Sequence, residues 1–63
     1  MEIKSSKMIE RLTIYDLSGR IIKTISYQGN FYTIDMESVD PGFYILVAVY
    51  PDRTKSVKKI VKQ

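Results

Sequence analysis

The chain has no cysteine, no histidine and no tryptophan among its 63 residues. Without cysteine it forms neither a disulfide nor a thiolate zinc site, and without histidine it has no imidazole base or metal ligand. These absences exclude hydrolases that depend on Ser-His-Asp or Cys-His groups. Stability must come from a small core, because a domain of about 60 residues buries only about 60% of its unfolded surface.

Long apolar segments are also missing. The longest, Phe43–Tyr50, has eight residues, far fewer than the roughly 20 that a membrane helix needs. The first residues, Met1–Ser6, lack the apolar stretch of a signal peptide. An apolar fraction of 44% and a charged fraction of 27% are typical of a globular chain. We therefore expect one domain, residues 1–63, that does not insert into a membrane.

Alternating apolar residues and regularly spaced turns predict an all-β fold. Leu12 and Ile14 alternate with polar neighbours, the pattern of a half-buried strand. Turn signals recur about every 8–12 residues, which favours a sandwich or barrel. A helix over Ser56–Lys62 is disfavoured, because β-branched residues fill it and no capping box precedes it. The expected strands are Ile3–Ser6, Ile9–Tyr15, Arg20–Ser26, Phe31–Asp35, Phe43–Tyr50 and Thr54–Lys62.

Asp, Pro and Gly mark the expected connections between these strands. Asp16–Gly19 has the residues of a type I turn, and Asp40–Phe43, with proline second and glycine third, has those of a type II turn. Tyr50–Arg53 carries proline at the second position of another turn. We also expect a loop at Tyr27–Asn30 and a surface turn at Met36–Val39.

The strand Phe43–Tyr50 is apolar on both faces. Tyr44, Leu46 and Ala48 lie on one face, and Phe43, Ile45, Val47 and Val49 lie on the other. A two-layer sandwich needs only one buried face per strand. We favour cover of the second face by a loop or a flanking strand of the same chain. The alternative is cover by a partner, either a second copy or a preceding domain.

The acidic residues are better explained by capping of turns than by catalysis or metal binding. Asp16, Asp40 and Asp52 fall in turns, where backbone capping explains them. Asp35 and Glu37 could approach each other, but so short a chain forms little of the cleft that catalysis needs. A calcium site from Asp35, Glu37 and Asp40 is a weaker alternative, since the acidic spacing is sparse. We expect neither an enzyme nor a resident metal or cofactor.

Half of the basic residues lie near the C-terminus. Five of the ten Lys and Arg occupy the last eleven residues, namely Arg53, Lys55, Lys58, Lys59 and Lys62. Together with five tyrosines elsewhere, they are compatible with a surface for single-stranded nucleic acid. We favour a solvated edge strand, in which lysines block edge-to-edge association. A net charge of +3 is weak support for polyanion binding.

Four motifs in a fixed order are more specific together than any one of them. They are Ile14–Arg20, Ile34–Met36, Pro41–Ile45 and, at the end of the chain, Lys59–Gln63. Their order and spacing resemble the type A C-terminal sorting domain of proteins exported by the type IX (Por) secretion system of Bacteroidota. The resemblance extends from about Ile9 to Gln63.

The resemblance implies a non-catalytic module with an immunoglobulin-like β-sandwich fold, carried after an N-terminal cargo domain. It implies recognition by the type IX secretion translocon after transit of the periplasm. Removal by a sortase-like protease would follow, and the cargo would reach the outer membrane, the cell surface or the medium. An exported location is compatible with the lack of cysteine.

The resemblance also assigns roles by position. Gly19 matches the hairpin glycine, Gly42 and Tyr44 match a Gly-x-Tyr motif, and Lys58–Lys62 match a terminal Lys-x-x-x-Lys signal. The expected structural motif comprises Asp16, Gly19, Pro41, Gly42 and Tyr44. The expected recognition residues are Lys58, Lys59, Ile60, Val61, Lys62 and Gln63.

The sequence departs from the family pattern at its start, where a Pro-Asn-Pro-like stretch and a first strand are expected. Met1 is therefore interpreted as an excision point or as an internal residue used as a start, and an open sheet edge would favour a homodimer. The apolar face of residues 43–49 is the other expected dimer surface. An immunoglobulin-like spacer or adhesion module is the main alternative function, and a small nucleic-acid-binding domain is the least favoured.

Overall fold

A computed structural model describes residues 1–26 and 28–63 of the chain. Over these residues it contains strands only, and every pairing between them is antiparallel. The strands are β1 (Glu2–Ile9), β2 (Arg11–Asp16), β3 (Ile21–Ile25), β4 (Gly29–Thr33), β5 (Gly42–Val49) and β6 (Lys55–Lys62). The predicted all-β fold is confirmed.

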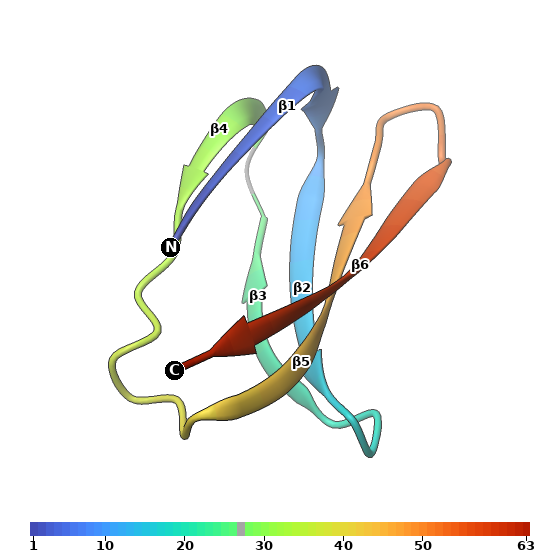
Figure 1. Ribbon diagram of the computed structural model, residues 1–63. Helices are drawn as coiled ribbons and strands as arrows, with labels where there is room; N and C mark the ends of the chain where they lie inside the picture. The colour runs from blue at the N-terminus through green and yellow to red at the C-terminus, as the bar shows by residue number, and fades with distance from the viewer. Residues whose placement is uncertain (27) are drawn as a thin grey trace.

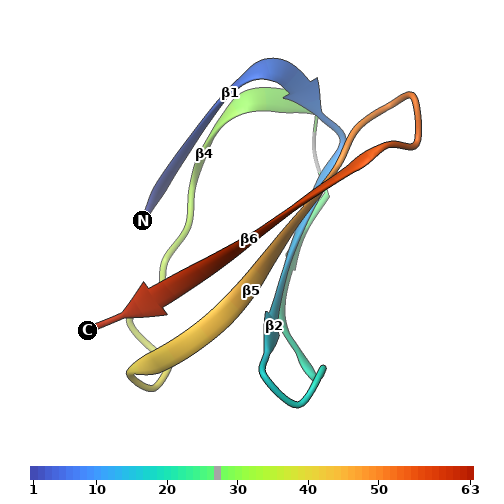
Figure 2. The ribbon, with the colours of Figure 1, turned by 45° about the vertical axis from the view of Figure 1, so that its right-hand side comes forward.

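The strands form two layers (Figure 1). A four-stranded sheet has the order β3-β2-β5-β6, and a two-stranded sheet pairs β1 with β4. β5 lies between β2 and β6, whereas β6 is an edge strand. The connection between β4 and β5 lies on the same side of the larger sheet as the smaller sheet (Figure 2). The arrangement is a small, partly open β-sandwich.

The core fills the space between the two sheets. Its largest fully buried side chains are Tyr32, Ile9, Leu12, Ile14 and Ile34. Side chains on a strand alternate between its faces, so every second residue of β2 and β5 reaches this core. Tyr44, Leu46 and Ala48 are buried as the alternation predicts.

The connection between β4 and β5 differs from the expectation. Met36–Val39 does form a turn, in which the Val39 N–H donates to the Met36 carbonyl at 3.0 Å. It is not a surface turn, however, because Met36 and Val39 are only 9% and 7% exposed. With only two strands in its smaller layer, the sandwich uses these two side chains to fill the rest of the core.

The first strand and the expected loop at Tyr27–Asn30 also differ. β1 extends over Glu2–Ile9, beyond the predicted Ile3–Ser6, because it pairs with β4 on both sides of an irregular register between Lys4 and Ile9. Tyr27 lies outside the described residues. Gly29 and Asn30 belong to β4, so the second half of the expected loop is strand.

The hairpins β2–β3 and β5–β6 share one turn geometry. In the first, the Asp16 carbonyl accepts from Gly19 at 3.1 Å and the Asp16 N–H donates to the Arg20 carbonyl at 2.9 Å. Gly19 has a φ of +92°, which glycine adopts without steric cost. In the second, Arg53 takes the corresponding place with a φ of +72°. Both turns were predicted at these positions.

The expected type II turn at Asp40–Phe43 is wrong. Pro41 is in a bend, and Gly42 opens β5 with a φ of +152°, far from the +80° or so of that turn type. Gly42 is already paired with Lys62 of β6. The strand ladder therefore sets the backbone here, one residue earlier than the turn pattern suggested.

Within residues 1–26 and 28–63, no layer covers the second face of β5. β2 and β6 flank β5 within the sheet and leave Ile45 and Val47 half-buried. Phe43, Val57 and Val61, on the same face by register, are 55%, 67% and 54% exposed. The favoured expectation is confirmed only in part: the flanking strands shield the middle of this face, where Thr13 is buried, but no loop of the described residues covers it. The smaller sheet and the connection between β4 and β5 both lie on the opposite side, where the core is.

We expect the Tyr32 hydroxyl to contribute measurably to stability. It donates to the Ile9 carbonyl at 3.0 Å inside the core. Tyr32→Phe leaves that carbonyl without this donor, and we expect urea denaturation to show a loss of about 1–3 kcal/mol in the free energy of unfolding. Tyr50→Phe is the matched control, because the Tyr50 hydroxyl contacts Ser56 at an exposed site. Its effect should stay within about 0.5 kcal/mol; equal losses in both variants would contradict the prediction.

Candidate functional site

The predicted recognition residues lie on an edge strand. β6 pairs with β5 from Lys55 opposite Val49 to Lys62 opposite Gly42. In the part of the chain that the structure describes, no strand lies beside the other edge of β6, and Gln63 follows as an exposed residue. An edge strand presents a row of backbone N–H and C=O groups that another chain can pair with. β6 is thus accessible to a partner along its length.

The recognition residues divide between the two faces of β6. Opposite residues of a pair point to the same face. Lys58 and Ile60 oppose the buried Leu46 and Tyr44, so they and Lys62 point toward the smaller sheet. Lys59 and Val61 point the other way. The structure therefore does not bring all six residues into one surface.

Lys58 stands at the rim of a groove between β6 and β1. The groove has a volume of about 210 Å³, with Leu46 and Ala48 at its base and Glu2 and Ser56 among its lining residues. Lys58 points toward the core side but is exposed, because it lines the open groove at the edge strand and does not lie under the smaller sheet. An incoming strand at this edge would contact Lys58.

The other two lysines of the signal are held by contacts within the chain. The Lys62 ammonium donates to the Val39 carbonyl at 2.6 Å, which ties the end of β6 to the buried turn after β4. The Lys59 ammonium lies 5.1 Å from the centre of the Phe43 ring, an attractive cation–π distance. Lys58 and Lys62 share a face about 14 Å apart, at about 3.4 Å per residue.

Strand pairing brings the predicted structural motif beside the terminal signal. Asp16 of β2 opposes Tyr44 of β5, and Tyr44 opposes Ile60 of β6. Gly42 opposes Lys62 in the same ladder. Residues from three separate motifs therefore lie in adjacent strands at one end of the larger sheet. Pro41, the remaining motif residue, is exposed in the bend that leads into β5.

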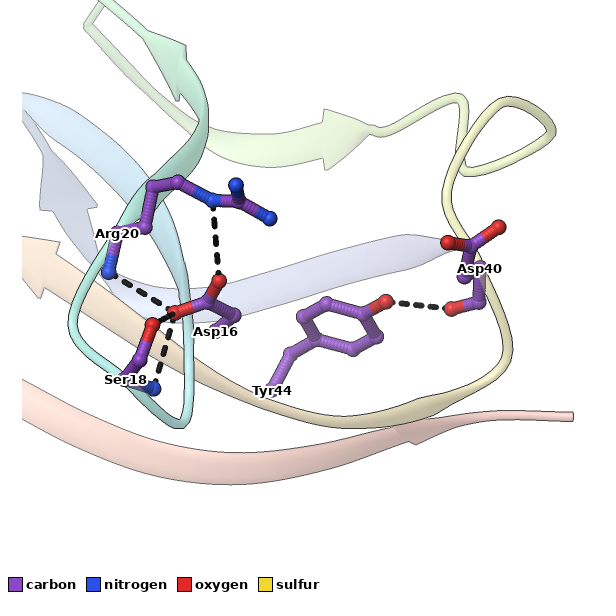
Figure 3. A network of polar contacts seen from close by, with 5 residues as sticks. All are labelled: Asp16, Ser18, Arg20, Asp40 and Tyr44. Carbon is purple, nitrogen blue, oxygen red and sulfur yellow. Dashed lines mark hydrogen bonds and ion pairs between the residues drawn. The ribbon is translucent and has the colours of Figure 1, made fainter.

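Asp16 organises the β2–β3 turn (Figure 3). Its Oδ1 accepts from the Ser18 N–H at 3.0 Å, from the Ser18 hydroxyl at 2.7 Å and from the Arg20 N–H at 2.9 Å. Its Oδ2 is 3.2 Å from Nε of Arg20. The Ser18 hydroxyl above all, and then the Arg20 N–H, hold the pKa of the Asp16 carboxyl below its usual range.

Tyr44 joins β5 to the preceding connection. Its hydroxyl donates to the backbone carbonyl of Asp40 (Figure 3). The expectation that the Asp40 carboxylate caps a turn is wrong, because the cap here is Asp35, whose Oδ1 accepts from the Glu37 N–H at 2.9 Å. The expected cap at Asp52 is present, since its Oδ1 accepts from the Thr54 N–H at 3.0 Å.

A polar hollow of about 390 Å³ lies between this turn and the connection before β5. Its lining residues include Asp16, Arg20, Lys23, Asp40 and Tyr44. Lys23 and Asp40 line this hollow from β3 and from the connection before β5, so local spacing in the sequence does not predict that they share it. The Asp16–Arg20 contact could be anticipated, since both residues belong to one turn motif.

The described residues contain no group of three or more Asp, Glu, His or Cys that could hold a metal ion. The calcium alternative therefore has no support from the structure. No helix in the described part of the chain could span a membrane. What the site offers is a strand edge for backbone hydrogen bonds, with ammonium groups on both faces, and this is the chemistry of a binding surface.

Comparison with protein families gives one match. The whole chain, residues 1–63, matches the family described as "Secretion system C-terminal sorting domain". No curated protein and no solved structure matches the chain.

We expect the Ser18 hydroxyl to set the pKa of Asp16. A carboxyl whose pKa is lower in the folded than in the unfolded state stabilises the fold at a pH above its unfolded-state pKa. This stabilisation is lost as the pH falls through the folded-state pKa. Ser18→Ala removes the main hydrogen bond, so the Asp16 pKa should rise and stability should fall less steeply on acidification below about pH 4. An NMR titration of the Asp16 carboxyl measures this. Ser6→Ala, at an exposed position of β1, should leave the titration as in wild type.

Proposed function

Since the chain belongs to the secretion system C-terminal sorting domain family, we propose that residues 1–63 form the sorting domain of an exported protein and that β6 is the strand its receptor binds. Family membership assigns the chain to type IX secretion as a C-terminal sorting signal. The receptor contact, the cargo on the N-terminal side and the fate of the domain are parts of the proposal.

The edge position of β6 is the observation that carries this proposal. A receptor strand can extend the larger sheet by pairing with the open edge of β6, and backbone hydrogen bonds then give affinity. Side chains beside the edge give specificity: Lys58 lies in the middle of β6, Lys62 at its end and Gln63 directly after it. Lys58 is free to contact an acidic group of the receptor at the groove rim.

The residues of the structural motif then hold β6, the strand that carries the signal, in position. The Asp16–Gly19 turn fixes the β2–β3 hairpin, and Tyr44 fixes the connection before β5 through the Asp40 carbonyl. Gly42 begins the ladder that holds Lys62 in register. None of these residues needs to touch the receptor, because their effect on recognition passes through the position of β6.

The route of the exported protein completes the proposal. The folded domain is recognised in the periplasm and directs passage of the cargo through the outer membrane by the type IX translocon. A sortase-like protease then removes the domain, and the cargo remains at the outer membrane, on the cell surface or in the medium. The domain itself has a non-catalytic role.

An export assay tests this function. A reporter protein fused before Met1 should be secreted by cells that have a type IX system, and Lys58→Ala or Lys62→Ala should retain it in the periplasm. Lys7→Ala is the matched control, because Lys7 is an exposed lysine on a strand of the other sheet and is not among the residues that line the groove beside Lys58. Circular dichroism melting separates loss of recognition from loss of folding, which matters for Lys62 because of its bond to Val39.

The Lys58 variant gives the decisive result. If the Lys58→Ala fusion melts like wild type and is secreted at the wild-type level, β6 is not the recognised strand. A tag added after Gln63 provides an independent test, since a spacer module would tolerate it and a terminal signal would not.

A further inference from the structure

We propose that the outer face of the larger sheet is a second docking surface, which binds an apolar protein surface rimmed by carboxylates. The outer face is the side of that sheet away from the core. Its exposed apolar residues on β5 and β6 are Phe43, Val57 and Val61, and Ile21 of β3 is exposed on the same face at the far side of Tyr15. The proposal rests on the sorting function, because the partner is taken to be a protein of the secretion machinery.

The apolar part of this face is continuous across β5 and β6. Phe43 opposes Val61, and Val47 opposes Val57, in the ladder that joins the two strands. Ile45 and Val49 occupy the other outward positions of β5. Directly opposed side chains on one face lie about 4.5–5.5 Å apart at Cβ, so these residues form one patch. A patch of this kind on a small domain marks an interaction surface.

Every charged side chain that the strand register places on this face is cationic. Lys55 and Lys59 are the outward charged residues of β6, and Arg11 is that of β2. The acidic Asp16 pairs with the core-facing Tyr44 and so belongs to the other face. Lysine and arginine therefore border the apolar patch without a carboxylate among the paired positions. A partner with acidic groups around an apolar centre complements this surface.

A second copy of the chain fits this face poorly. Two copies related by a two-fold axis would bring the same patch together, and Lys55, Lys59 and Arg11 of each would meet a surface without acidic partners. Like charges held together oppose association, and the whole chain already carries a net charge of +3.

A nucleic acid also fits poorly. Its bases stack on aromatic rings, but the exposed ring of this face, Phe43, has the Lys59 ammonium over it, and the other outward ring, Tyr15, is half-buried beside Ile45. The neighbouring outward residues Val47, Val57 and Val61 are aliphatic and offer no ring. A protein partner is therefore the favoured occupant.

Paired substitutions of the full chain, fused to the same secreted reporter, test the two halves of the proposal. Val57→Thr with Val61→Thr removes apolar surface and keeps β-branched side chains, whereas Lys55→Glu with Lys59→Glu reverses the rim charge. Each pair should lower secretion about fivefold or more, as expected for interface positions that matter, with the melting midpoint unchanged. Thr24→Lys is the control, since Thr24 lies on the same face but on β3, away from the patch.

The outcomes separate this inference from the sorting function. Failure of the wild-type fusion to be secreted overturns the sorting function, whereas wild-type secretion by both paired variants overturns only the outer-face proposal. If secretion falls with the valine pair but not with the lysine pair, the proposal that the partner has carboxylates around its apolar surface is overturned. If the isolated chain sediments as a dimer and the valine pair of substitutions dissociates it, the outer face binds a second copy of the chain instead. Tight, steeply salt-dependent binding of a single-stranded oligonucleotide assigns it to nucleic acid.

Discussion

The fold depends on β5 being paired on both sides. Its ladder with β2 and its ladder with β6 share one register, so that Asp16, Tyr44 and Ile60 form a row across the three strands. The inward residues of β5 supply much of the core, and its outward residues form one apolar patch with Val57 and Val61 of β6. Because the chain has no disulfide, this central strand is the element that joins the core, the turns and the terminal strand.

Much of this arrangement could be predicted from local patterns. The alternation of Leu12 and Ile14, the β-branched residues of Lys55–Lys62 and the Asp and Gly of the first hairpin identify strands and a turn without tertiary information. The buried side of β5 was also predictable, because Tyr44, Leu46 and Ala48 occur at a spacing of two.

The errors share one physical cause, which is that pairing and packing between distant segments override local preference. Gly42 is in a strand and not in a type II turn because β6 pairs with it. Met36 and Val39 are buried because the smaller sheet has only two strands. The division of the lysine signal between two faces of β6 follows from alternation, but the sequence does not show which face the rest of the chain covers.

The position of the C-terminus has a mechanical consequence. Gln63 extends from the end of β6 that lies beside the start of β5, so tension on the tail against β5 would open the ladder from one end. The hydrogen bonds would then break in succession, starting where Lys62 pairs with Gly42, and not all at once as in shear. The hydrogen bond from the Lys62 ammonium to the Val39 carbonyl lies at this end of the ladder, so it resists the first step of the separation. The segment that displays the signal is thus also the segment that a pulling machine would detach first.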